Sequence, residues 1–352
     1  MLMDDTAILA TSREAMQQKL CLLLRATQAI AMEIHPDKSL YITVNTRDTT
    51  PFYVDDTPIR HTKSYVYLGT PISNKTINAQ LADHIASKQN HVRKFLSFLS
   101  KNSEAPFCVK KTVWESALTS SLLYSCETWL TDNTTAACTP YLSTIKAMLG
   151  VRIQTPTDLV HLELGIPTID GLIKKRQQDF LLKVRASNFY DVSPLKLAME
   201  LCQRVNSPMG KYLSKLNSED PVEASLSLLK QRVRNSQTSR CATYLTINPD
   251  LIVHPIYTSR LNVPEHRRIA LTRIRLSSHY LRIETGRWSR TPREERLCQC
   301  GLDVQTECHV LLQCPQTETF RQKITATDMK TLMEQPEDEL CILSYNVLNF
   351  FK

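Results

Sequence analysis

Residues 1–11 have the sequence Met-Leu-Met-Asp-Asp-Thr-Ala-Ile-Leu-Ala-Thr, in which the adjacent carboxylates of Asp4 and Asp5 stand between two apolar runs. Apolar residues on both sides of a short polar pair are typical of a tight β-hairpin whose strands are half buried. Two aspartates at the tip of such a hairpin offer the hard oxygen ligands that Mg²⁺ prefers. The alternative is an ordinary polar turn, because turns are commonly rich in Asp.

The segments after this pair follow in a definite order. Apolar residues recur at helical spacing over residues 12–34, with Ser12 in the N-cap position. Residues 40–72 alternate between apolar and polar as strands do. The Asp-Asp-Thr-Pro stretch at 55–58 predicts a structural turn between two of these strands.

This order resembles that of the reverse transcriptases of non-LTR (LINE-type) retrotransposons. In that family an aspartate pair, a helix, a lysine-bearing strand and a tyrosine-leucine-glycine hairpin follow one another. The resemblance implies that Asp4 and Asp5 are catalytic ligands of Mg²⁺. It also places Lys38 near the phosphates of the incoming nucleotide, and Tyr67 and Gly69 at the primer end of the nucleic acid. A solvated lysine at the end of a strand is the alternative for Lys38.

Two departures from the family pattern bear on catalysis. The family has an aromatic residue and then alanine before the aspartate pair, where this chain has Leu2 and Met3. In the family a separate upstream aspartate and the fingers region complete the polymerase site. Because Asp4 is the fourth residue, we expect the pair to bind Mg²⁺ only together with those parts, and the chain alone not to extend a primer.

Composition and charge narrow the class of protein. The chain has 352 residues, of which 42% are hydrophobic and 22% charged, as in ordinary globular proteins, and its net charge of +8 favours a polyanionic partner. No apolar run is long enough to span a membrane and the N-terminus has no secretory signal. We therefore expect an intracellular protein, nuclear or cytoplasmic, without a membrane partner and without a disulfide framework despite 11 cysteines.

Arginine is concentrated between residues 260 and 300. This segment contains ten arginines, four glutamates and no lysine, which leaves a local charge of +6. Guanidinium groups bind phosphates and stack on bases, and aromatic rings lie nearby in the sequence. The alternative is a solvated, helix-stabilising surface on which Arg293, Glu294, Glu295 and Arg296 pair with one another. The residues predicted to contact nucleic acid are Arg273, Arg275, Arg282, Arg287, Trp288, Arg290 and Arg293.

A Cys/His cluster follows immediately. Cys298, Cys300, His309 and Cys314 fall within 17 residues, with Gly301 after the first pair. Two cysteines on a turn, followed by a histidine and a cysteine five residues apart, are typical of a closed tetrahedral zinc site, although one residue between the first cysteines is fewer than usual. Free cysteines in core positions are the alternative, and Cys308 is a substitute ligand beside His309. The LINE-type family ends in a similar cluster.

The predicted fold is mainly α with a small antiparallel β portion. In the terms of the family it comprises a partial reverse-transcriptase palm, a helical thumb and a small zinc-knuckle-like C-terminal module. Only 7 glycines are present, which makes tight turns scarce and favours helices. The expected parts are the partial palm at 1–73, the thumb at 74–187 and a helical linker or extension at 188–258. Residues 259–352 are expected to hold the arginine segment, the Cys/His module and two terminal helices, at 320–333 and 339–351.

These features support three hypotheses of function. The first is the C-terminal part of a LINE-type reverse transcriptase, an RNA-directed DNA polymerase, binding an RNA or DNA template-primer and other parts of the retroelement protein. The second is a standalone nucleic-acid-binding zinc protein without catalysis. The third is a decayed retroelement relic with no selected role. The sequence does not discriminate RNA from DNA as the partner.

Overall fold

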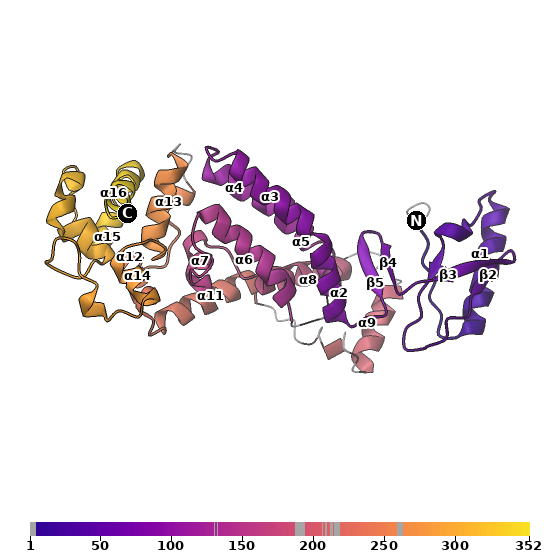
Figure 1. Ribbon diagram of the computed structural model, residues 1–352. Coiled ribbons are helices and arrows are strands. Elements are labelled where there is room, and N and C mark those ends of the chain that lie inside the picture. Colours follow the sequence, from indigo (N-terminus) through magenta and orange to yellow (C-terminus); the bar gives the residue numbers. More distant parts are fainter. Residues whose placement is uncertain are drawn as a thin grey trace. The chain divides into compact units, whose positions relative to one another are not determined.

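The computed structural model describes residues 5–129, 131, 133–186, 194–205, 207, 210–211, 214, 219–258 and 263–352 (Figure 1). It is mainly helical, with two small β-sheets. The chain divides into two compact units, residues 1–87 and 88–352. Each unit is described by itself.

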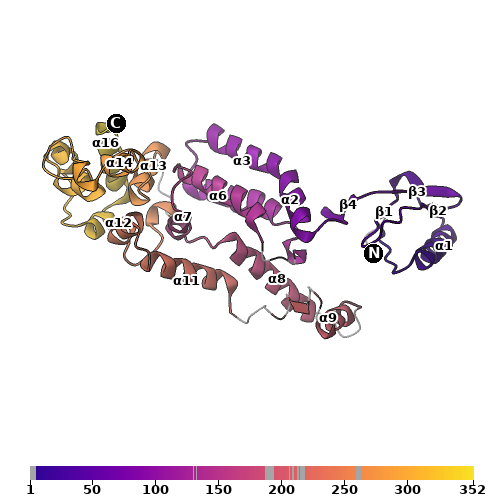
Figure 2. The same cartoon turned by 60° about the horizontal axis from the view of Figure 1, so that its bottom comes forward.

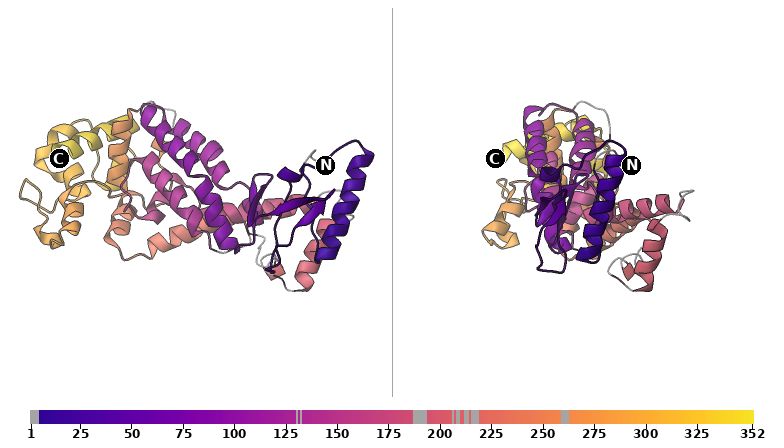
Figure 3. Two further views of the ribbon diagram at one scale, coloured as in Figure 1. Left: turned by 45° about the vertical axis from the view of Figure 1, so that its right-hand side comes forward. Right: turned by 90° about the vertical axis from the view of Figure 1, so that its right-hand side faces the viewer.

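In the first unit one helix packs on a three-stranded sheet. Helix α1 (Arg13–Ala29) begins at Ser12, whose hydroxyl oxygen accepts a hydrogen bond from the Ala15 amide at 3.2 Å, as expected for an N-cap. The helix lies along β2 (Phe52–Val54), and Figure 3 shows it beside the strands. The apolar stripe of the helix, including Met16, Leu20 and Leu24, covers the buried residues of the sheet. Those buried residues are Phe52, Val54 and Ile59.

The sheet has the strand order β1-β3-β2. Strands β2 (Phe52–Val54) and β3 (Thr57–His61) are antiparallel, with Phe52 opposite Ile59. The short strand β1 (Leu40–Tyr41), which follows the 3₁₀ helix η1 (Pro36–Lys38), pairs with β3 in parallel. The sheet is therefore mixed, and only part of it matches the predicted antiparallel arrangement.

Both predicted turns are present. Asp55 and Asp56 connect β2 to β3 with φ of +45° and +57°, so this second aspartate pair is a structural turn, as predicted. Strands β4 (Ser64–Tyr67) and β5 (Thr70–Ser73) form a separate hairpin, followed by α2 (Ile77–Ser87). Its two turn residues, Leu68 and Gly69, have φ of +47° and +78°, a conformation that glycine adopts without strain.

The predicted N-terminal hairpin does not form in the described part of the chain. Residues 5–12 contain no strand. Two backbone carbonyls in this segment accept hydrogen bonds from side chains: Lys19 Nζ donates to the Leu9 oxygen at 2.7 Å, and Tyr67 Oη donates to the Asp5 oxygen at 3.5 Å. The strand predicted after the aspartate pair is therefore absent, whereas the strand predicted before it, residues 1–3, lies outside the described residues. Asp4 lies outside the described residues.

The second unit begins with a group of packed helices that confirms the helical pattern predicted for this region. Helices α3 and α6 lie side by side in Figure 2 and contact each other. The group consists of α3 (Gln89–Lys101), α4 (Phe107–Val113), the π-helix η2 (Trp114–Thr119), α5 (Ser120–Leu122), η3 (Cys126–Thr128), α6 (Thr135–Leu149), α7 (Thr157–Leu164) and α8 (Ile169–Arg185).

The region predicted as a helical linker or extension, residues 188–258, packs against other helices in its described part. Helix α11 (Pro221–Arg234) packs against α7 and α8, and α12 (Ser239–Ile247) packs against α15 (Met329–Met333). Tyr244 on α12 is fully buried. The helices of this region and of the C-terminal part are α9 (Pro194–Arg204), α11 (Pro221–Arg234), α12 (Ser239–Ile247), η5 (Pro255–Tyr257), α13 (Glu265–Arg275), α14 (Arg282–Trp288), η6 (Arg293–Glu295), η7 (His309–Gln313), η8 (Pro315–Arg321), α15 (Met329–Met333) and α16 (Glu337–Phe350).

Both terminal helices of the prediction appear, but the first is shorter than expected. Helix α16 covers most of the predicted range 339–351 and packs on α13. Of the range 320–333, only α15 is α-helical, capped at Asp328, whose side chain accepts from the Thr331 amide at 2.8 Å. In the described ranges, no helix combines the length and the apolar character needed to cross a bilayer.

Candidate metal centre and arginine segment

The four residues predicted to bind metal lie together. The ligand atoms of Cys298, Cys300, His309 and Cys314 all fall within 4.8 Å of one another. The Sγ atoms of Cys298 and Cys314 are 3.7 Å apart, and Cys300 Sγ is 3.2 Å from His309 Nε2. A tetrahedral zinc ion with bonds of about 2.3 Å to sulfur requires sulfur atoms roughly 3.8 Å apart. The spacing of the two buried cysteines fits this requirement.

Two local backbone features create this arrangement. Cys298 and Cys300 lie on a turn in which the Gly301 amide donates to the Cys298 oxygen at 2.9 Å, closed by an antiparallel bridge between Leu297 and Val304. His309 begins the π-helix η7, and the Cys314 amide donates to the His309 oxygen at 2.7 Å. This five-residue hydrogen bond brings both side chains to the same side of the helix.

Electrostatics favour a cation among these sulfur atoms. Burial raises the pKa of the Cys298 thiol to about 11. The pKa of Cys300 is below its usual value, because hydrogen bonds from backbone amides such as that of Leu302 outweigh the opposing effect of burial. The thiolate of Cys298 is thus unfavourable unless a cation compensates its charge, as zinc does when it binds thiolates. Cys308 is not a member of the cluster.

A carboxylate beside the cluster connects it to the arginine segment. Glu307 is buried and accepts hydrogen bonds at Oε1 from Ser277 Oγ at 2.8 Å and from His279 Nε2 at 2.9 Å. His279 holds the pKa of Glu307 below its usual range, although burial acts in the opposite direction. Next to it, Gln305 accepts from the Arg282 amide at 2.7 Å. The loop between α13 and α14 is therefore anchored to the module that carries the Cys/His cluster.

One arginine predicted to contact nucleic acid is in the core. Arg275 is buried and bonds the carboxylate of Glu163 with distances of 2.5 and 3.1 Å. A side chain without solvent exposure cannot reach a phosphate. The prediction for Arg275 is therefore wrong, because its charge is compensated by a glutamate more than a hundred residues away.

Other arginines of the segment bind the protein's own backbone. Arg273 is half buried and donates from Nε to the Gly150 oxygen at 2.8 Å. Arg268 is buried, pairs with Glu265 at 2.8 Å and donates to the Met148 oxygen. Arg296 donates to the backbone oxygens of Thr291 and Ile283, not to a neighbouring glutamate. Much of the local charge therefore stabilises the fold.

The remaining predicted residues lie on the surface. Arg282, Trp288, Arg290 and Arg293 are exposed, and Arg287 is half buried. Trp288 is 54% exposed, and the guanidinium of Arg152 lies over its ring at 4.7 Å. Arg282 begins α14, Trp288 ends it, and Arg290 and Arg293 follow it in the chain. The structure leaves these side chains accessible, and their contact with nucleic acid stays a prediction.

The polymerase-like residues fall in the first unit. Asp5 and Lys38 are exposed, Gly69 is at the tip of the β4–β5 hairpin, and the Tyr67 hydroxyl reaches the Asp5 backbone. Among the described residues, Asp5 belongs to no group of three or more metal-ligating side chains. The catalytic roles predicted for these residues stay predictions.

Two arginines at this surface were not predicted from the sequence. Arg152 and Arg240 lie outside the arginine-rich segment but contact Glu284 within it. Arg152 lies two residues after Gly150, the residue at which α6 ends. Arg240 is in the first turn of α12. No pattern along the sequence connects these positions to α14.

A comparison with protein-family models, curated proteins and solved structures found no match.

Proposed function

We propose that this chain is a zinc-stabilised, nucleic-acid-binding part of a LINE-type reverse transcriptase. The observation that carries the proposal is the convergence of three thiols and one imidazole within 4.8 Å. Three sulfur ligands and one nitrogen ligand without an open position are typical of structural zinc and not of catalytic zinc. The metal would stabilise the fold of the module, and the side chains of the protein would bind the nucleic acid.

Zinc is supported by the small apolar core of the module. Leu297 and Leu302 are exposed, whereas Val310 and Leu311 are fully buried. Each buried side chain of this size contributes roughly 1.5–3 kcal/mol. A structural zinc site contributes on the order of 10 kcal/mol of apparent binding free energy. Metal binding is thus the larger source of stability for this segment.

Nucleic-acid binding is supported by the surface beside the metal centre. Arg282, Arg290 and Arg293 are exposed, and the exposed ring of Trp288 lies near them in the sequence. Guanidinium groups bind phosphates, and an exposed ring offers a stacking platform for a base. The net charge of +8 favours association with a polyanion.

The assignment to a reverse transcriptase is supported by the order of segments in the first unit. A capped helix, the segment ending at Lys38 and the hairpin with Gly69 at its tip follow one another as in the LINE-type family. Asp4 and Asp5 would hold Mg²⁺, which in a polymerase stabilises the charge that develops during phosphoryl transfer. An in-frame palm and fingers region encoded upstream of Met1 would support this assignment, and an unrelated upstream sequence would contradict it.

The binding function is tested on the purified full chain. Elemental analysis of reduced, zinc-supplemented protein is expected to give one zinc per chain. Affinity for single-stranded RNA or DNA is expected to fall with salt, with a slope of log affinity against log salt of about −0.7 per phosphate contact. Protein without zinc, or binding that does not respond to salt, would contradict the proposal.

A further inference from the structure

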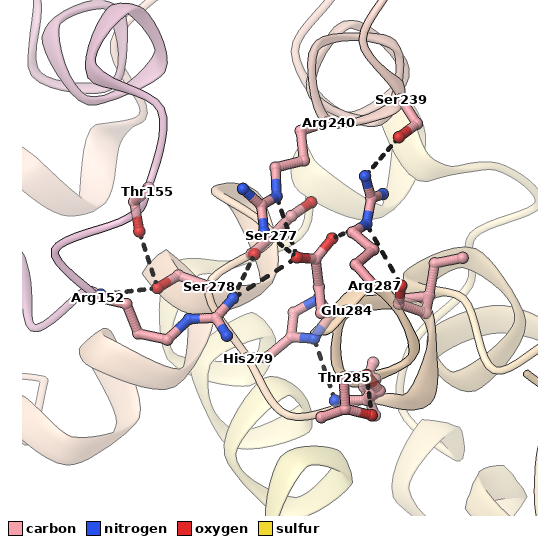
Figure 4. A network of polar contacts seen from close by, with 12 residues as sticks. Arg152, Thr155, Ser239, Arg240, Ser277, Ser278, His279, Glu284, Thr285 and Arg287 are labelled. Carbon is pink, nitrogen blue, oxygen red and sulfur yellow. Dashed lines mark hydrogen bonds and ion pairs between the residues drawn. The ribbon is translucent and has the colours of Figure 1, made fainter. Parts of the chain in front are cut away.

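Three arginines from different parts of the chain surround one buried carboxylate. Glu284 on α14 is fully buried. Arg240 donates to its Oε2 from Nε at 3.0 Å and from Nη2 at 2.6 Å. Arg287 Nε is 3.0 Å from Oε1, and Arg152 Nη2 is 3.6 Å from Oε2. Figure 4 shows the three guanidinium groups pointing to Glu284 from different sides.

Further hydrogen bonds hold these arginines in place. The Ser278 hydroxyl oxygen accepts from the Arg152 amide at 2.9 Å, and Arg152 Nη2 donates to the Ser277 backbone oxygen at 3.2 Å. Arg287 Nη1 donates to Ser239 Oγ at 2.5 Å (Figure 4). The guanidinium groups are therefore positioned before any ligand binds, which reduces the entropy lost on binding.

The arginine trio, Arg152, Arg240 and Arg287, has more charge than Glu284 compensates. Three guanidiniums face one carboxylate, which leaves a surplus of two positive charges. Burial lowers the pKa values of Arg152 and Arg287 below their usual range, and the charge of Arg240 lowers them further. Both remain charged because arginine does not lose its proton near neutral pH. A second anion would relieve this repulsion.

The trio also has unused donors that face partly accessible space. The side chains of Arg152, Arg240 and Arg287 are 19%, 22% and 25% exposed. Within the described residues, no hydrogen bond uses Nη1 of Arg152, Nη1 of Arg240 or Nη2 of Arg287. These donors match the oxygens of a phosphate group.

Two aromatic rings lie beside the trio. The Arg152 guanidinium is 4.7 Å from the ring centre of Trp288 and 6.0 Å from that of Tyr280. The two rings meet edge to face at 6.0 Å, and both side chains remain 54% exposed. An unstacked base can lie on such a ring while its phosphate contacts the neighbouring arginine. Bases inside a duplex are already stacked and do not reach it.

We propose that Arg152, Arg240 and Arg287 bind a backbone phosphate of single-stranded nucleic acid while an adjacent base stacks on Trp288. Glu284 is a positioning residue that holds the three arginines together. The inference rests on the proposed nucleic-acid binding and deepens it by specifying the site and the strandedness of the ligand. Either RNA or DNA provides the required phosphate and unpaired base.

The test compares binding of labelled oligo-dT, oligo-rU and a mixed-sequence duplex of equal length to the full chain. The charge variant is Arg240→Gln, which leaves Glu284 paired with two arginines and so preserves the fold. Its matched control is Arg204→Gln, which removes the same charge from α9, where the Arg204 side chain is 76% exposed. Arg240→Gln should make the single-strand salt slope shallower by about 0.7, and the control should not.

The stacking contact is tested at Trp288. Trp288→Ala should weaken single-strand binding about tenfold while leaving duplex binding nearly unchanged. Trp288→Phe, which keeps an aromatic face, should bind more tightly than Trp288→Ala. Since Trp114 and Trp129 are buried, quenching of intrinsic fluorescence by an oligonucleotide should disappear in both variants.

Three results would overturn the inference. One is an equal effect of Arg240→Gln and Arg204→Gln on the salt slope. Another is an equal loss of single-strand and duplex affinity in Trp288→Ala, and the third is the absence of fluorescence quenching in the wild-type protein. Salt-dependent binding by the wild type would in each case still support the proposed function. A wild-type protein that binds no nucleic acid would overturn both.

Discussion

Arg275 Nε donates to Glu163 Oε1 at 2.5 Å, and both side chains are buried although they are 112 residues apart in the sequence. The hydroxyls of Tyr244 and Tyr257 donate to the same carboxylate at 2.9 and 2.8 Å. Burial by itself would raise the pKa of Glu163, but Arg275 outweighs it and holds the pKa below the usual range. This network joins α7, α12, η5 and α13.

Replacing Glu163 should destabilise the protein strongly. Glu163→Gln leaves Arg275 as a buried charge without its partner, and breaking such a pair costs about 3–5 kcal/mol. Urea unfolding followed by circular dichroism measures the change. Glu318→Gln, at an exposed position, is the matched control and should change the free energy of unfolding by less than about 0.5 kcal/mol. Equal effects of the two substitutions would contradict the structural role of Glu163.

His254 should make stability depend on pH. Burial lowers its pKa from 6.5 to about 4, although the hydrogen bond to the Met333 backbone oxygen acts in the opposite direction. The neutral ring also accepts a hydrogen bond at Nδ1 from the Ile256 amide, which a protonated Nδ1 could not do. The unfolded chain thus takes up this proton at a higher pH than the folded protein. The free energy of unfolding should fall by up to about 3 kcal/mol as the pH decreases from about 6.5 to about 4.

The control for His254 is a variant that cannot take up a proton at this position. His254→Gln cannot titrate, so its free energy of unfolding should vary less between pH 7 and pH 5 than that of the wild type. The difference between the two proteins isolates His254 from other groups, including the metal ligands, that take up protons in the same range. Identical pH profiles would show that His254 does not contribute.

Metal binding should depend on His309 and not on its neighbour. His309→Ala removes one of four converging ligands and should abolish stoichiometric zinc, whereas Cys308→Ser should retain it because Cys308 lies outside the cluster. Elemental analysis of the two purified variants measures the number of zinc ions per chain. Chelation of zinc from the wild type should unfold the module around residues 297–315 and leave most helical circular dichroism intact. Loss of zinc in Cys308→Ser would instead make Cys308 a ligand.

Two glycines with the same backbone conformation should differ in their tolerance of alanine. Gly150 and Gly301 have φ of +73° and +74°, where a side chain costs about 1–2 kcal/mol. A Cβ at Gly150 would lie 2.7 Å from the Ile269 side chain, whereas one at Gly301 would meet no atom within 4 Å. Gly150→Ala should therefore lower the unfolding free energy by about 1–3 kcal/mol more than Gly301→Ala. Thermal unfolding of both variants in the presence of zinc measures this difference.

Features encoded within short stretches were predictable from the sequence. The four residues of the Cys/His cluster span 17 residues and converge as expected, because a turn and one helical segment are sufficient to bring them together. The N-cap at Ser12 and the turns at Asp55 and Gly69 are also local, since each depends on the conformational preferences of a few residues. The strand predicted after Asp5 is absent from the described residues, because an apolar run alone does not determine whether a strand forms.

The sequence by itself determined where the Cys/His cluster and the turns lie and where arginine is concentrated, because these depend on residue types and spacing along the chain. Only the tertiary structure decided which arginines are available to a ligand. Arg275 is hydrogen-bonded to Glu163, 112 residues away in the sequence, and Arg273 to the Gly150 backbone oxygen, 123 residues away. Arg152 and Arg240, which lie outside the arginine segment, instead form ion pairs with Glu284 on α14. Charge compensation depends on distance in space, and folding brings together charges that the sequence holds far apart.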